Sequence, residues 1–182
     1  MERQCVDRYF IVDNKSQVLN ISLIKKYDKN GMIQIYEKWP EMAKNAFNSK
    51  YKVVDIKNIN HVIFAGMGGS GAIGDIFESI LSKTNIHVSV VKGYLLPKTI
   101  TENTLIIITS VSGNTVESLT VLENAKKTKG KIIVFSSGGK CEQYSIRNNI
   151  QYYKIKKIHS PRASFVTFLF SMLKIFQNII SI

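Results

Sequence analysis

The sequence predicts an α/β fold, a doubly wound five-stranded parallel sheet flanked by helices and preceded by an N-terminal helical segment. Three observations predict it: short apolar runs recur from residue 61 onward, amphipathic stretches separate them, and glycine-rich loops follow several runs. Apolar, β-branched runs without polar alternation are typical of strands that helices cover on both faces. Helices of this length between strands indicate crossover connections, and therefore parallel strands.

The expected elements follow from these patterns. The strand candidates are residues 61–65, 87–91, 105–109, 131–135 and 150–155. Between them we expect helices at 72–81, at 116–127, which ends in lysines followed by Gly130, and at 141–147. A last helix is expected from about residue 163 to residue 182, and an early one over 32–47, where apolar residues recur at helical spacing despite Pro40. These patterns divide the chain into a helical extension, 1–58, and an α/β domain, 59–182.

Size and composition indicate one soluble globular domain: 182 residues, 45% of them hydrophobic and 21% charged. Cys5 and Cys141 fit neither a disulfide framework nor a metal site, and no basic start with an apolar stretch follows Met1, so we expect a cytoplasmic protein and no metal. The formal charge of +12 comes from scattered lysines rather than from a recognition helix or interleaved aromatics. This pattern favours anionic metabolites over nucleic acid as partners.

Two loops follow predicted strands and enter predicted helices, and both suit an anion. The first, the glycine loop, is Gly66-Met-Gly-Gly-Ser-Gly71, where four glycines allow close backbone approach and Ser70 adds a hydroxyl. The second, the hydroxyl loop, is Ser110-Val-Ser-Gly-Asn-Thr115. Its three hydroxyls belong to Ser110, Ser112 and Thr115, while Gly113 and Asn114 permit a tight turn before a helix N-terminus. Unpaired N–H groups and a positive dipole end there favour phosphate.

Each loop also has another interpretation. Gly66, Gly68 and Gly71 match a dinucleotide-binding pattern, yet Lys92 stands where an acidic residue would hold the ribose, which argues against NAD and leaves NADP open. Thr115 alone could be an ordinary helix N-cap. Three hydroxyls in six residues exceed what a cap needs, so the pattern favours a phosphate site.

The order and spacing of several motifs resemble the N-terminal half of the bifunctional phosphoglucose/phosphomannose isomerases, which contain sugar isomerase (SIS) domains. The motifs are Gly68-Gly-Ser-Gly71, Ser110-Val-Ser-Gly-Asn-Thr115 with Glu117, Gly138-Gly139 and Pro161-Arg-Ala163. The resemblance spans about residues 31–182 and implies a flavodoxin-like SIS fold.

The resemblance implies an activity as well: interconversion of glucose 6-phosphate or mannose 6-phosphate with fructose 6-phosphate, by proton transfer through an enediolate and without a cofactor. Carried over, Gly68, Gly69 and Ser70 of the glycine loop, with Ser110, Ser112, Gly113, Asn114 and Thr115 of the hydroxyl loop, would hold the hexose 6-phosphate. Arg162 would be catalytic, stabilising the enediolate oxygen. Glu117, in the first turn of a helix, is interpreted as structural.

The chain departs from the family in one respect. In the resembling proteins the base, a histidine that assists ring opening and a lysine lie in a second half that this sequence does not contain. His61 and His87 begin strands, and His159 is no evident replacement. The chain is therefore expected to be an isomerase half that works with a second SIS domain or in a homo-oligomer. The alternative is a non-catalytic SIS module that binds or senses a phosphosugar.

The stretch 163–182 is nearly all apolar, with Lys174 near its middle. Its length alone would suit a membrane span, but a central charge is costly in lipid, so a buried helix is expected. Its large apolar residues cannot all face one side of a helix, which predicts cover by another chain and therefore a dimer or a larger assembly.

Overall fold

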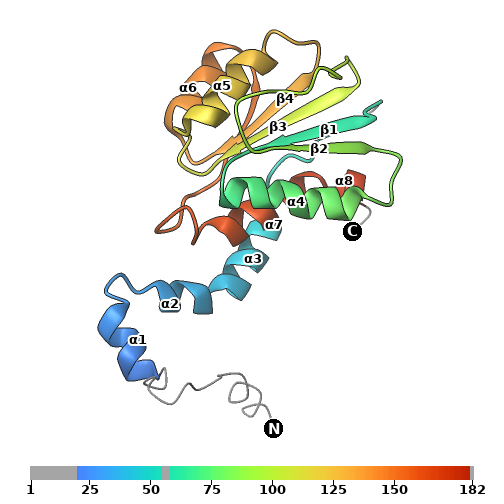
Figure 1. The fold of residues 1–182 in the computed structure, drawn as a ribbon. Coiled ribbons are helices and arrows are strands. Elements are labelled where there is room, and N and C mark those ends of the chain that lie inside the picture. Colours follow the sequence, from blue (N-terminus) through green and yellow to red (C-terminus); the bar gives the residue numbers. More distant parts are fainter. Residues whose placement is uncertain (1–19, 55–57, 181–182) are drawn as a thin grey trace, which may run out of the picture. The chain divides into compact units, whose positions relative to one another are not determined.

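The computed structural model describes residues 20–54 and 58–180 (Figure 1). Their contacts group into two compact units, Met1–Glu37 and Lys38–Ile182. The first contains α1 (Ile21–Tyr27) and α2 (Met32–Glu37), and the carboxylate of Asp28 accepts hydrogen bonds of 2.8 Å from the N–H groups of Met32 and Ile33 at the start of α2. The helix expected over 32–47 is divided at Lys38, because α3 (Trp39–Phe47) begins with Pro40 in its first turn. The expected domain division at residues 58 and 59 stays a prediction.

The sheet of the second unit has five parallel strands in the order β2-β1-β3-β4-β5. They are β1 (His61–Ala65), β2 (His87–Val91), β3 (Thr104–Ser110), β4 (Lys131–Ser136) and β5 (Gln151–Lys154). All five predicted strands are confirmed, with bounds that shift by one residue at most. In the centre, Ile63 pairs with Ile106, which pairs in turn with Ile132.

Helices cover both faces of this sheet, as the unbroken apolar strands require. One face packs under α4 (Gly69–Leu81) and α7 (Phe165–Ile175), and the other under α5 (Val116–Ala125) and α6 (Gly139–Arg147) (Figure 1). Successive strand residues alternate between the two cores: Phe64 packs on the α4 side and Ile63 on the α5 side. The doubly wound fold is confirmed.

Two of the three crossover helices start earlier than the apolar pattern indicates, whereas α5 begins at Val116 as expected. Helix α4 begins at Gly69 rather than at residue 72, and α6 at Gly139 rather than at 141. Both first turns consist of glycine and polar residues, which sequence patterns assign to loops. Gly74 inside α4 has a packing reason, since a Cβ there would lie 2.9 Å from the Cβ of Phe64.

The last helix is not continuous, which corrects the single helix expected over 163–182. Helix α7 ends at Ile175, Phe176 caps it, and α8 (Gln177–Ile180) follows. The break coincides with a long-range contact, because the carbonyl of Ile175 accepts a hydrogen bond of 3.1 Å from the N–H of Val54 instead of continuing the helix.

The apolar residues of this C-terminal stretch are covered by the chain itself. Helix α3 packs along α7; Phe168, Met172 and Phe176 belong to one core cluster, and Phe165, Leu169 and Leu173 pack against it while partly buried. Their number therefore does not by itself require a second chain. No helix within the described residues is long and apolar enough to cross a membrane.

Candidate functional site

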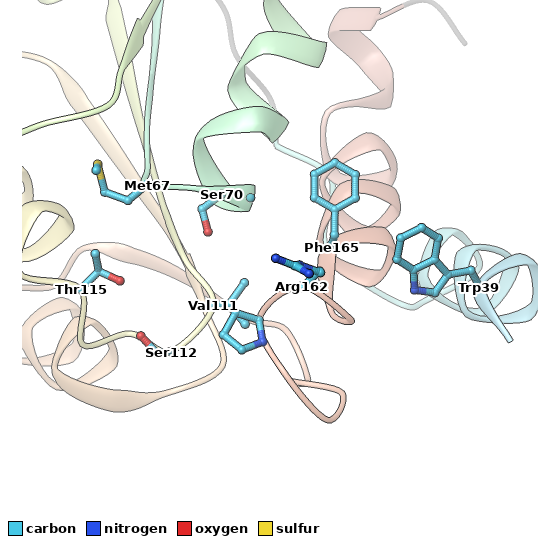
Figure 2. A pocket seen from close by; sticks show the side chains of 10 residues that line it. Trp39, Met67, Ser70, Val111, Ser112, Thr115, Arg162 and Phe165 are labelled. Carbon is cyan, nitrogen blue, oxygen red and sulfur yellow. The ribbon is translucent and has the colours of Figure 1, made fainter. Parts of the chain in front are cut away.

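The strand order creates a crevice at the carboxyl-terminal end of the sheet. Strands β1 and β3 are neighbours, but the chain leaves β1 for α4 on one face and β3 for α5 on the other. Such a switch point, at the carboxyl ends of parallel strands, is where open α/β sheets bind ligands. A pocket of about 380 Å³ lies there. It is lined by Trp39, Met67, Gly69, Ser70, Val111, Ser112, Thr115, Pro161, Arg162 and Phe165 (Figure 2).

The hydroxyl loop has its own hydrogen bonds. The Ser110 hydroxyl accepts from the N–H of Gly113 at 3.1 Å and lies 3.0 Å from the Thr115 hydroxyl. The Ser112 hydroxyl accepts from the N–H of Asn114 at 3.2 Å. Thr115 occupies the N-cap position of α5, as the alternative expects, but its hydroxyl makes no side-chain capping bond. Buried Ser110 shapes the loop, whereas Ser112 and Thr115 line the pocket.

The loop that connects β4 to α6 holds the hydroxyl loop in place. Gly113 has a φ of +68°, and a Cβ there would lie 1.7 Å from the carbonyl oxygen of Gly138. The N–H of Cys141 donates to the Gly113 carbonyl at 2.9 Å, and the N–H of Lys140 donates to Asn114 Oδ1 at 3.0 Å. These contacts build the binding loop before any ligand arrives.

The glycine loop forms the next wall. A Cβ on Gly71 would lie 2.8 Å from the carbonyl oxygen of Gly66, so the loop closes more tightly than a side chain would allow. Gly68, with a φ of +54°, is the N-cap of α4, and Gly69 and Ser70 lie in the first helical turn. The first turn of α4 therefore presents its N–H groups and one hydroxyl at the pocket.

The opposite wall combines aromatic rings with one cation. Arg162 lies just before α7, and Figure 2 shows its side chain extending toward Ser70 and the loops, with Phe165 and Trp39 beside it. Within the part of the chain that the structure describes, the guanidinium has no hydrogen bond or ion pair. An ordinary surface salt bridge therefore does not account for Arg162.

The electrostatics of the pocket favour a negative charge. Three helices, α4, α5 and α7, begin at its walls and bring the positive ends of their dipoles there. Among the described lining residues Arg162 is the charged one, and none is an aspartate, glutamate or histidine. Behind the hydroxyl loop, burial raises the pKa of the Cys141 thiol to about 11, so this thiol stays protonated at neutral pH and is no nucleophile.

The structure brings together five of the nine predicted site residues: Gly69, Ser70, Ser112, Thr115 and Arg162 line the pocket. Gly68, Ser110, Gly113 and Asn114 lie directly behind the lining, in the turns that shape it. Sequence reasoning missed the apolar part of the lining, which is Trp39, Met67, Val111 and Phe165. Trp39 and Phe165 recur at helical spacing with other apolar residues, and that pattern indicates core rather than a binding wall.

The other candidates lie away from this pocket. Lys92, the residue for which NADP binding stayed an alternative, donates a 2.6 Å hydrogen bond to Asp75. Its cation is therefore already paired. His61 and His87 begin their strands, at the end of the sheet opposite the pocket, and their rings contact each other in a tilted arrangement with centroids 4.8 Å apart. His159 and Glu117 do not line the pocket. No group of three or more potential metal ligands occurs among residues 20–54 and 58–180.

Comparisons with known proteins agree with this geometry. The chain is 33% identical over 144 residues to the bifunctional phosphoglucose/phosphomannose isomerase of Caldicellulosiruptor bescii, covering 75% of this chain and 42% of the relative. It is 32% identical over 159 residues to the enzyme of the same name from Pyrobaculum calidifontis, covering 83% and 51%. The chain thus spans about half the length of these curated relatives.

A solved structure shares this fold. The C-terminal domain of glucosamine-fructose-6-phosphate aminotransferase from Francisella tularensis superposes with a TM-score of 0.68 at 17% identity, over 86% of this chain and 49% of that one. Residues 55–171, more than half of the chain, match the SIS domain model. With its parallel sheet, switch-point pocket and hydroxyl loop, the chain belongs to the SIS domain family.

Proposed function

We propose that this chain is the phosphate-binding half of an aldose–ketose isomerase that converts glucose 6-phosphate or mannose 6-phosphate to fructose 6-phosphate. The observation that carries the proposal is the pocket itself, where two hydroxyls of one loop, three helix N-termini and a guanidinium face one space without a carboxylate in the described lining. A dianionic phosphate on a small polar molecule fits these groups. The names of the relatives support a hexose 6-phosphate as that molecule.

The lining suggests a role for each polar group. Ser112 and Thr115 donate their hydroxyl protons to the phosphate, helped by the free N–H groups in the first turn of α5. Gly69 and Ser70 contact the sugar, while Gly68, Ser110, Gly113 and Asn114 hold the two loops in shape. Arg162 stabilises the negative oxygen of the enediolate, because its cation opposes the charge that develops there.

The missing group is a base. Proton transfer between C1 and C2 needs a carboxylate or imidazole within hydrogen-bond reach of the carbon, and the described lining offers neither. We therefore propose that a second SIS domain supplies it, from a separate chain or from a homo-oligomer such as a dimer. The proposed setting is the cytoplasm, where phosphosugars are metabolised.

The same observation favours one alternative, a SIS module that binds or senses a phosphosugar without converting it. Mixing the chain with a second SIS domain distinguishes the two functions. A separately expressed second SIS domain from a relative should restore isomerase activity to an enzyme half, whereas a binding module would stay inactive with saturable phosphosugar binding.

Both functions require phosphate binding at the hydroxyl loop, so substitutions in this loop test both. Ser112→Ala with Thr115→Ala should weaken fructose 6-phosphate binding by roughly 2–4 kcal/mol, because each hydroxyl donates to a charged group. Isothermal titration calorimetry measures this loss. Ser82→Ala with Thr120→Ala is the matched control, since those hydroxyls donate to backbone carbonyls of their own helices outside the pocket. Equal affinity in the wild type and the Ser112/Thr115 double variant would remove the site from this loop.

A further inference from the structure

The aromatic wall of the pocket contains the single tryptophan of the chain, Trp39 at the start of α3. It lines the pocket together with Pro161 and Phe165, opposite Ser112 and Thr115 of the hydroxyl loop (Figure 2). The pocket thus has its hydroxyls on the side of the loops and its aromatic rings on the side of α3 and α7. A free phosphate would need only the hydroxyl side, so the aromatic side is built for the rest of a larger ligand.

Trp39 is also bonded to the backbone that carries Arg162. Its indole N–H donates to the carbonyl of Ala163 at 3.2 Å, across 124 positions of sequence. Ala163 is fully buried, and a buried carbonyl without a donor is unfavourable. The bond therefore ties α3 to the peptide that directly follows Arg162.

The segment that carries Arg162 is fixed from its other side too. The buried Ser164 hydroxyl accepts from the N–H of Ile158 at 2.8 Å and lies 2.8 Å from the carbonyl oxygen of Ser160, to which it donates. These bonds hold residues 158–164 as a compact turn, and the indole anchors that turn to α3. The Arg162 side chain, which has no partner among the described residues, depends on this backbone for its direction.

We propose that Trp39 makes this pocket select a sugar phosphate over free phosphate: its ring covers the carbon chain of the bound sugar phosphate, and its N–H holds the Arg162 turn in place. The inference rests on the proposed function, since it assigns the apolar wall to the same ligand. An aromatic face packs well against the C–H groups of a sugar, and Phe165, which is partly exposed, extends the same surface.

The experiment uses the chain as it is, with fructose 6-phosphate and inorganic phosphate as the two probes. Because Trp39 is the one tryptophan, its fluorescence reports directly on the wall. Fructose 6-phosphate should change the emission, whereas inorganic phosphate, which reaches only the loops, should leave it nearly unchanged. Calorimetry on Trp39→Phe and Trp39→Ala then gives the affinities for both probes.

Trp39→Ala should lower the affinity for fructose 6-phosphate by about 10- to 100-fold and that for inorganic phosphate by less than about twofold. Trp39→Phe, which keeps a ring and loses the N–H, should lower the sugar-phosphate affinity by about threefold to tenfold. Phe47→Ala is the control for a loosened α3, because Phe47 belongs to the same helix and lies outside the pocket. It should leave both affinities unchanged.

The outcomes distinguish a failure of this inference from a failure of the proposed function. If the wild type binds neither probe, the proposed function fails and this inference fails with it. If the wild type binds fructose 6-phosphate while Trp39→Ala binds it equally well, the function stands and the role of Trp39 is wrong. Equal losses for both probes would also overturn it, because a merely structural tryptophan would weaken the whole pocket.

Discussion

At the scale of single residues, the site depends on glycines whose backbone conformation disfavours any side chain. Gly113 and Gly68 both have positive φ, which any other L-residue adopts only with strain. They differ in their surroundings. A Cβ on Gly113 would meet the Gly138 carbonyl at 1.7 Å, whereas one on Gly68 would find nothing within 4 Å.

Gly113→Ala should therefore be much more destabilising than Gly68→Ala. Backbone strain costs both variants about 1–2 kcal/mol, and Gly113→Ala adds the displacement of the loop between β4 and α6. Urea unfolding of the two variants measures the difference. Equal losses of unfolding free energy would mean that the loop between β4 and α6 shifts easily and does not hold the hydroxyl loop.

His61 gives the molecule a defined dependence on pH. Burial, followed by the nearby His87 ring, lowers the pKa of His61 below its ordinary value of 6.5, and the neutral imidazole hydrogen-bonds with Ser89 at 3.0 Å. In the unfolded chain the same imidazole takes up its proton near pH 6.5. The unfolded state then binds more protons, so stability falls as the pH drops below that value.

His61→Gln should remove part of this fall, because glutamine keeps a polar partner for Ser89 without titrating. The melting temperature of the wild type should decline more between pH 7 and pH 5 than that of the variant. Parallel curves for the two proteins would show that His61 is not the titrating group.

At the scale of elements, α7 serves both the core and the pocket. Phe168 is fully buried against the sheet, whereas Phe170 on the same helix is only partly buried and lies outside the core cluster. Phe168→Ala should cost about 3–5 kcal/mol of unfolding free energy, because the rigid core cannot close the cavity. Phe170→Ala should cost clearly less in the same denaturant titration, and a reversed order would contradict this packing.

The elements also show what sequence patterns can and cannot predict. The central strands were predictable because apolar, β-branched runs such as that of β3 have few other uses. The first turn of α4 was not, because its glycine and serine residues are typical of a loop. The break after Ile175 depends on Val54, 121 positions earlier in the sequence, so no local pattern contains it. The loops of the site were predictable from hydroxyls and glycines, but the Trp39 wall was not, because an aromatic at helical spacing equally indicates core.

At the scale of the whole molecule, the chain should bind a sugar phosphate and isomerise it poorly. Without a base in the described lining, its rate should fall short of that of a full-length relative by about 10²–10⁴, the usual value of general-base assistance. A coupled assay for glucose 6-phosphate formed from fructose 6-phosphate measures this. Full activity that Glu117→Gln or His159→Ala abolishes would place the base in this chain.

The walls of the pocket come from residues 39, 67–70, 111–115 and 161–165, which together span most of the compact unit Lys38–Ile182. A ligand therefore recognises the finished fold and no fragment of it. A growing chain on the ribosome gains this pocket only after α7 has emerged. Once bound, a phosphosugar at 100 times its dissociation constant would favour the native state by about 2.7 kcal/mol, so the abundance of the metabolite would set how long the protein survives proteolysis in the cell.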